Sequence, residues 1–330
     1  MPERLKSVRL AILLLFALLS FVICLNTGAV QLQWQALWSC LGGAHCEQAS
    51  QWQVLWQLRL PRLLLGFVAG AGLALCGALL QHLSRNPLAD PYLFGIIAGA
   101  GLGATVATLY LPGSVIMLPL AAFAGALLAI ALVLCFALWA RWQNLDHFIL
   151  SGVAVSFLFS AITALLLYQH DPFAANRVMF WLMGSLTRAD YQALWFILPC
   201  LLLCLGLALL FRRQLDAMLW SDQTALSLGV QVQPIRLLFL ILTAALTACI
   251  VAFCGGIGFV GLMVPHLVRF LIGAQAFTLF IGSSLCGGIF LIWVDAGART
   301  LLPNQELPLG VITSACGSIF FLLLLSRRRG

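Results

Sequence analysis

The chain has 330 residues, of which 63% are hydrophobic and only 8% are charged, and its mean hydropathy is +1.07. A water-soluble domain of this size carries charge on roughly a quarter of its residues, so the composition excludes a soluble fold and indicates a membrane protein. The net charge of +7 comes from basic residues scattered between apolar runs, which argues against nucleic acid as a partner and is typical of the ends of membrane helices.

Long apolar runs divide the chain into about ten segments, each near the roughly 20 residues that cross a hydrocarbon core about 30 Å thick. They predict an all-α polytopic membrane protein that forms one transmembrane domain over residues 1–330. The expected spans are residues 10–30, 63–83, 92–111, 115–139, 148–168, 193–211, 237–254, 258–271, 276–295 and 307–325.

The first span begins like a signal peptide, with Arg4, Lys6 and Arg9 ahead of an apolar core. No small-x-small cleavage site follows that core, so we expect a retained helix. Residues 237–268 raise a second question, because 32 helical residues would reach about 48 Å and exceed one upright span. Gly255-Gly256-Ile257-Gly258 supplies a break, and we interpret the run as two crossings.

With ten crossings both termini lie on the same side, which we predict to be cytoplasmic. This places twelve basic residues inside and five outside, as the positive-inside tendency favours. The inner group is Arg4, Lys6, Arg9, Arg85, Arg141, Arg212, Arg213, Arg236, Arg269, Arg327, Arg328 and Arg329, and the outer group is Arg59, Arg62, Arg177, Arg188 and Arg299.

A faint internal repeat relates residues 59–168 to residues 236–326. A shift of 174 residues places Arg62 on Arg236, Leu88 on Leu262, Pro91 on Pro265 and Gly99 on Gly273. The second and seventh spans are five apart, so the two halves would have opposite topologies. Inverted repeats of this kind are common in transporters.

The eleven cysteines include no CxxC pair and no Cys/His set with zinc spacing, so we predict no metal site. Most lie within apolar runs, where thiols pack as small hydrophobic groups. Cys40 and Cys46 lie together in a polar stretch expected outside the membrane, and the sequence leaves open whether they form a disulfide.

Catalytic signatures are missing from the sequence. Lys6 is the only lysine, so the chain has no phosphate-binding P-loop, and neither HExxH nor GxSxG occurs. We therefore predict no catalytic residue and no cofactor in this chain, and rank a membrane enzyme last. Asp295 comes closest to an acid within a span. An ion-coupled secondary carrier that uses Asp295 is one alternative, and energy supplied by a separate ATPase subunit is the other.

Several ordered sequence blocks resemble one family over nearly the whole chain. This is the permease family of ABC importers for iron-siderophores, haem and vitamin B12, the FecCD/BtuC-like permeases. The blocks are Arg59-Leu-Pro-Arg62, Arg85-Asn-Pro-Leu-Ala-Asp-Pro91, Trp181-Leu-Met-Gly-Ser-Leu186, Gly258-Phe-Val-Gly-Leu-Met-Val-Pro-His-Leu-Val-Arg269, Asp295-Ala-Gly-Ala-Arg299 and Glu306-Leu-Pro-Leu-Gly310.

The resemblance implies a homodimer in the bilayer of a bacterial inner membrane, with a pathway on the two-fold axis. It further implies two ATP-binding subunits that hold ATP and Mg²⁺ on the cytoplasmic side and a periplasmic substrate-binding protein on the other. An iron-siderophore is the first expectation for the cargo, and haem and vitamin B12 stay open as alternatives.

The resemblance also implies three groups of functional residues. Arg59, Arg62 and Arg299 match the arginines that dock the binding protein, with anchoring to lipid headgroups as the alternative. The segment 212–236 matches the part that couples to the ATPase, with an ordinary surface helix as the alternative. The coupling residues are expected to be Asp222, Ala225, Leu226 and Gly229, with Leu228 as a further apolar contact.

A cytoplasmic gate is expected at two places. Asn86 and Leu88 match its first half, although a purely structural proline turn explains Asn86 equally well. Leu145 and Asp146 match its second half, where this sequence departs from the small hydroxyl residues of the vitamin B12 importer.

Overall fold

The structure, a computed structural model, describes residues 3–28, 52–111, 116–139, 145–302 and 305–327. Within these residues the chain is helical and contains no strand. The helices are α1 (Glu3–Asn26), α4 (Leu60–Ser84), α5 (Ile96–Tyr110), α6 (Met117–Trp139), α7 (Leu145–Tyr168), α8 (Pro172–Leu182), α9 (Tyr191–Leu210), α10 (Arg212–Trp220), α11 (Asp222–Ser227), α12 (Val232–Cys254), α13 (Val260–Leu271), α14 (Ala276–Ala298) and α15 (Leu309–Arg327). A π-helical turn η1 (Val54–Arg59) leads into α4, and a 3₁₀ turn η2 (Pro91–Phe94) precedes α5.

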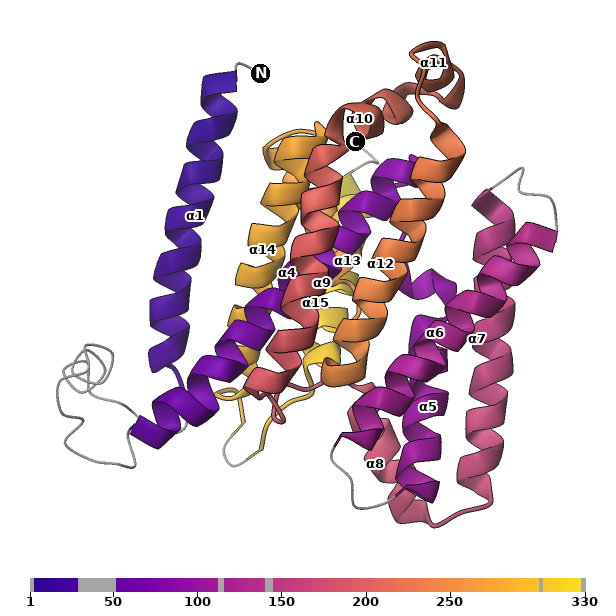
Figure 1. The fold of residues 1–330 in the computed structure, drawn as a ribbon. Helices are drawn as coiled ribbons and strands as arrows, with labels where there is room; N and C mark the ends of the chain where they lie inside the picture. Colours follow the sequence, from indigo (N-terminus) through magenta and orange to yellow (C-terminus); the bar gives the residue numbers. More distant parts are fainter. Residues whose placement is uncertain (1–2, 29–51, 112–115, 140–144, 303–304, 328–330) are drawn as a thin grey trace.

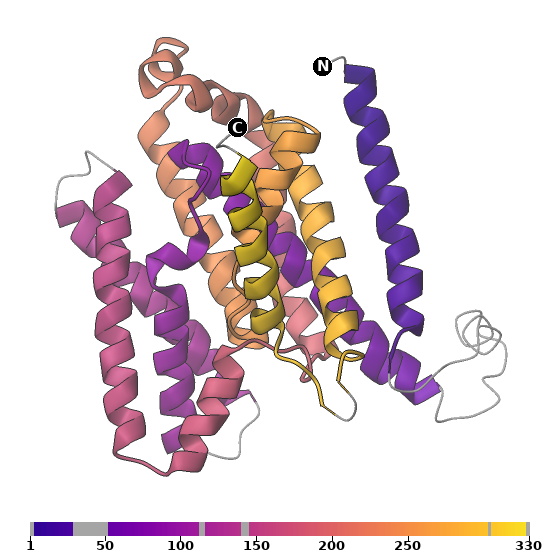
Figure 2. The same ribbon diagram turned by 180° about the vertical axis from the view of Figure 1, so that it is seen from behind.

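The ten predicted spans correspond to described helices. Eight of these are long and apolar enough to cross a membrane, and the two shorter apolar helices are α5 and α13. Both chain ends lie at one end of the bundle together with α10 and α11, whereas α8 lies at the other (Figures 1 and 2). We call these the α11 end and the α8 end. The shared position of the two termini agrees with an even number of crossings.

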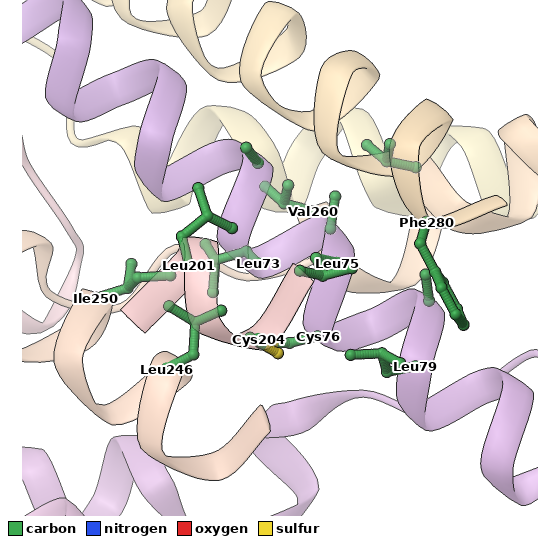
Figure 3. Close-up of a cluster of buried hydrophobic side chains, with 14 of the residues drawn as sticks. Leu73, Leu75, Cys76, Leu79, Leu201, Cys204, Leu246, Ile250, Val260 and Phe280 are labelled. Carbon is green, nitrogen blue, oxygen red and sulfur yellow. The ribbon is translucent and has the colours of Figure 1, made fainter. Parts of the chain in front are cut away.

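Helix α4 forms the centre of the bundle. Its most apolar stretch is 89% buried, compared with 22% for α1 and 17% for α7. Leu73, Leu75 and Leu79 of α4 pack among Leu246 and Ile250 of α12, and side chains of α9, α13 and α14 complete this core (Figure 3). The outer faces of α1, α7 and α15 instead expose leucine and phenylalanine, as expected for surfaces that contact lipid.

Glycines allow α4 to approach its neighbours closely. A Cβ at Gly70 would lie 2.3 Å from the carbonyl oxygen of Gly287 in α14, and one at Gly77 would overlap the carbonyl of Gly261 in α13. Lipid tails are as apolar as the helices, so membrane helices associate through such close packing rather than through a hydrophobic driving force.

Irregular backbone shortens α5 and α13. Asp90 caps η2 by accepting a hydrogen bond from Tyr92 N–H at 2.8 Å, and Gly95 adopts φ +72 before α5 begins. Gly255 has φ +70 after α12 ends. The hydroxyl of Tyr92 donates to the carbonyl oxygen of Ile257 at 2.9 Å and accepts from its N–H at 3.1 Å. This pair of bonds joins the two irregular segments inside the bundle.

The first span was expected to reach residue 30, but α1 ends at Asn26, where arginines bind the last carbonyl groups of the helix. The residues Cys40 and Cys46 lie outside the described part. Helices α4 and α12 run in opposite directions, as an inverted repeat requires (Figure 1), although the repeat boundaries stay a prediction.

Candidate functional site

Arginine and carboxylate side chains form a cluster at the α8 end. Arg62 Nη2 lies 2.8 Å from Asp295 Oδ1 and 2.8 Å from Glu306 Oε2. Arg299 Nε lies 3.1 Å from Asp295 Oδ2, one helical turn further along α14. Asp295 is only 1% exposed. A buried carboxylate requires paired cations and hydrogen bonds to offset its lost hydration, and the two arginines supply both.

The same cluster holds the end of α1. Arg59 Nη1 donates to the carbonyl oxygens of Leu25 and Asn26 at 3.0 and 3.1 Å, and Arg299 Nη1 donates to that of Thr27 at 3.0 Å. The last carbonyls of a helix lack intrahelical donors and form the negative end of its dipole, so cations stabilise them. Two of the predicted docking arginines therefore fasten α1 to the bundle.

The structure thus brings Arg59, Arg62 and Arg299 together as a group, with Asp295 and Glu306 as counter-charges. Three arginines against two carboxylates leave one net positive charge. Glu306 is the most accessible of the paired carboxylates, with 41% of its side chain exposed. The hydrogen bond from Arg62 holds the pKa of Glu306 below its usual range. Docking by these arginines stays a prediction.

A second cluster lies at the α11 end. Asp222, the first residue of α11, accepts hydrogen bonds from Arg85 at 2.7 Å and from Arg236 at 2.9 and 3.0 Å. Ser221 caps α11 by accepting from Thr224 N–H at 2.9 Å. The ion pairs of Arg85 and Arg236 with Asp222 are not predicted from the sequence, although Arg85 lies within a block that resembles the permease family.

The predicted coupling residues divide into two groups. Ala225 is fully buried against the chain itself, so it offers no surface to a partner. Leu226 and Leu228 are 60% and 68% exposed and project from the bundle. Gly229 lies in the turn between α11 and α12 and has φ +78. A Cβ added at this glycine would meet no atom within 4 Å. Among these residues the exposed apolar surface therefore comes from the two leucines, and Trp220 at the end of α10, which is 83% exposed, adds to it.

Helix α10 anchors this segment to the membrane core. Its Leu215 and Met218 are buried, and the Leu215 carbonyl oxygen accepts a hydrogen bond from His82 Nε2 of α4 at 3.1 Å. Asp216 accepts from the N–H of Ala276 at the start of α14 at 2.8 Å. A cleft of about 680 Å³ opens beside α10, and its lining includes Arg213, Gly229 and Pro234. The coupling segment therefore offers a partner both this cleft and the projecting side chains of Leu226 and Leu228.

Asn86 organises the turn after α4. Its Oδ1 accepts from Leu88 N–H at 2.9 Å, and its carbonyl oxygen accepts from Ala89 N–H at 3.2 Å. These hydrogen bonds support the explanation that Asn86 stabilises a structural proline turn. Leu88 is 60% exposed. Burial raises the pKa of Asp90 to about 6, although the hydrogen bond from Tyr92 N–H opposes that shift.

The second predicted half of the gate lies at the start of α7. Leu145 and Asp146 are its first residues, and their side chains lie outside the described part. The structure therefore does not relate them to Asn86 and Leu88, and the gate stays a prediction. Among the described side chains, no group of three or more His, Cys, Asp or Glu is arranged to hold a metal ion.

Comparison with known proteins adds independent information. A profile of the FecCD transport family matches residues 14–327. The Fe(3+) dicitrate transport system permease protein FecD of Escherichia coli is 37% identical and covers 93% of this chain and 95% of its own length. The hemin transport system permease protein HmuU of Yersinia pestis is 36% identical over 92% of this chain and 91% of its own.

A solved structure supports the same conclusion. It is described as a metal-chelate type ABC transporter in an inward-facing conformation and superposes with a TM-score of 0.87, at 34% identity, over 97% of this chain and 99% of that one. The bundle of apolar helices and the match over nearly all of the sequence agree with one another. The chain belongs to the FecCD transport family and is a multi-pass membrane permease of an ABC importer.

Proposed function

We propose that this permease carries an iron chelate, in the first instance an iron-siderophore, across the bacterial inner membrane. In this proposal two copies form the pathway, a periplasmic binding protein delivers the chelate at the α8 end, and two ATP-hydrolysing subunits act at the α11 end. The observation that carries the proposal is the match of nearly the whole fold to a metal-chelate type transporter. FecD, which is named for ferric dicitrate, supports the same class of cargo.

Haem and vitamin B12 remain the alternative cargoes. FecD and HmuU are equally similar to this chain, at 37% and 36% identity, so overall identity does not separate an iron chelate from hemin. Both cargoes are large metal chelates, and a broad apolar pathway would contact either one through many weak interactions.

A binding and uptake screen distinguishes the cargoes. The permease, its ATPase subunits and its binding protein would be reconstituted in proteoliposomes and supplied in turn with ferric siderophores, ferric citrate, hemin and cobalamin. We expect ATP-dependent uptake of a ferric siderophore or ferric citrate in preference to the other two. Preferential uptake of hemin or cobalamin would contradict the proposed cargo but leave the importer role intact.

The ion-coupled alternative relied on Asp295. The structure pairs this carboxylate with two permanent cations, Arg62 and Arg299, and buries it almost completely. A coupling acid has to exchange its ion with the pathway during each cycle. Asp295 instead contributes to a fixed charge cluster, and we therefore assign the energy source to the separate ATPase.

A further inference from the structure

The end of α4 carries two contacts that hold the segment 212–227 to the membrane core. His82 Nε2 donates to the carbonyl oxygen of Leu215 in α10 at 3.1 Å. Three residues later, Arg85 Nη2 donates to Asp222 Oδ1 of α11 at 2.7 Å. Both α10 and α11 are therefore attached to the same end of the most buried helix in the bundle.

Arg85 occupies an unusual backbone position. It follows the last residue of α4 with φ +54, in the left-handed region, where glycine is the usual residue at the end of a helix. An arginine there is disfavoured by its Cβ. What the arginine adds over glycine in this structure is its ion pair with Asp222. The side chain, rather than the backbone, accounts for an arginine at this position.

The residues after Arg85 form a compact unit. Hydrogen bonds within the turn join Asn86 to Leu88 and Ala89, and Asp90 then caps η2. The Tyr92 hydroxyl continues the connection to Ile257, between α12 and α13. A displacement of Arg85 would therefore move this turn as a body and reach both irregular segments of the bundle.

We propose that Arg85 is a positioning residue of the transport cycle, whose ion pair with Asp222 transmits the movement of α11 to the turn at residues 86–90. The inference rests on the proposed function, because it assigns α11 to contact with the ATP-hydrolysing partner. Arg236 of α12 binds the same carboxylate from within the coupling segment and keeps it oriented toward Arg85.

The exposure of the pair indicates what it contributes. The side chains of Arg85 and Asp222 are 35% and 38% exposed. Ion pairs at such exposure add little to the stability of a fold, because water and salt screen them. Loss of the pair should therefore leave the permease folded and assembled while it changes how α11 and the turn move together.

The test measures chelate uptake and ATP hydrolysis in the same proteoliposomes, containing permease, ATPase and binding protein with ferric citrate or a ferric siderophore as the probe. Arg85→Asn keeps a residue that tolerates the left-handed backbone but removes the charge. We expect uptake per ATP hydrolysed to fall by about fivefold or more, the range of typical coupling between sites. Arg9→Gln removes an exposed arginine of α1 at the same end, outside the coupling segment and without touching the pair, and should retain the wild-type ratio.

Further variants separate transmission from a structural role. Asp222→Asn should lower the ratio as much as Arg85→Asn, the double variant should lower it no further, and Arg85→Lys should restore part of it. Thermal denaturation and co-purification of the ATPase should stay unchanged in each. A wild-type ratio in Arg85→Asn, or additive losses in the double variant, would overturn the inference. Absence of ATP-driven uptake by the wild-type permease would contradict the proposed function instead.

Discussion

Two clusters of charged residues in this apolar chain join distant parts of the sequence. Arg62 binds Asp295 and Glu306 from 233 and 244 residues away, and Arg85 binds Asp222 from 137 residues away. The cost of removing each charge from water near the membrane favours a partner over solitary exposure. In both clusters a carboxylate lies between two arginines, so each cluster keeps a net positive charge.

Glu306 offers the sharpest test of docking at the α8 end. Glu306→Gln removes the accessible carboxylate from Arg62, raises the net charge of the cluster by one and frees a donor for a carboxylate of the binding protein. We expect tighter docking and a faster association rate at low salt, measured by surface binding of the binding protein to permease in nanodiscs. Reversing the charge of Arg59 or Arg62 by substitution with glutamate is a poorer test, because the new carboxylate would be buried without a cationic partner.

Asp171→Asn is the matched control for that experiment. Asp171 is an exposed carboxylate at the same end of the bundle, where it caps α8 through Phe173 N–H, and asparagine retains the cap. The control should dock like the wild type. Docking that weakens or stays constant in Glu306→Gln would argue that the arginines only fasten α1 and α14 together.

The raised pKa of Asp90 predicts a pH-dependent stability. A carboxyl group with a folded-state pKa of about 6, above its ordinary value, keeps its proton in the folded state after the unfolded state has lost it. Its ionisation therefore destabilises the fold as pH rises through roughly 4 to 6. Asp90→Asn retains the cap on η2 and should melt at a higher temperature than the wild type at pH 7.5, with the difference vanishing near pH 4. A lower melting temperature for Asp90→Asn at pH 7.5 would contradict this account.

At the scale of elements, the contact between α4 and α14 depends on glycine. Gly70→Ala would place a Cβ 2.3 Å from the Gly287 carbonyl oxygen and 2.7 Å from Leu291 Cβ. Overpacking of this kind costs about 1–3 kcal/mol. We expect a lower melting temperature in detergent, whereas Gly206→Ala in α9, which meets no atom within 4 Å, should match or exceed the wild type. Equal melting temperatures for the two variants would show that α4 and α14 can move apart at little cost, which would contradict this prediction.

The coupling segment gives a second prediction at this scale. Gly229 borders the cleft beside α10, and a tryptophan there would block a partner that approaches Leu226 and Leu228. Gly229→Trp should hydrolyse ATP without uptake, measured in the assembled complex. Because φ +78 disfavours any side chain, Gly229→Asn serves as the control for backbone strain and should retain uptake. Normal uptake by Gly229→Trp would remove the segment from the ATPase contact.

The elements that the sequence predicts well are those set by local hydropathy. All ten apolar segments correspond to helices, since length and apolarity alone determine them. The short helices α8, α10 and α11 are not among the predicted spans. Which of their faces is buried depends on neighbours distant in sequence, so local hydropathy does not predict it. For the same reason the inward orientation of Ala225 and the counter-charges of Arg62 were not foreseen. Asp295 and Glu306 both lie within sequence blocks that resemble the permease family, and this was the signal in the sequence that could have pointed to them as partners of Arg62.

At the scale of the whole molecule, α4 connects the two charge clusters. Arg62 lies in its first turn and Arg85 directly follows its last residue, which separates them by about 34 Å along the helix axis at about 1.5 Å per residue. The helix is buried along nearly its whole length, so it can move only together with its neighbours. The end that would receive the binding protein and the end that would receive the ATPase are therefore parts of one rigid element.

The most direct test of the account asks whether this chain transports without its ATPase. The purified permease alone would be reconstituted in vesicles, with an imposed proton or sodium gradient, and the accumulation of ferric citrate, ferric siderophores and hemin would be followed against their concentration gradients. We predict no uphill accumulation of any of them until the ATPase subunits, the binding protein and ATP are added. Accumulation by the permease alone would contradict the claim that its energy comes from ATP hydrolysed on a separate chain.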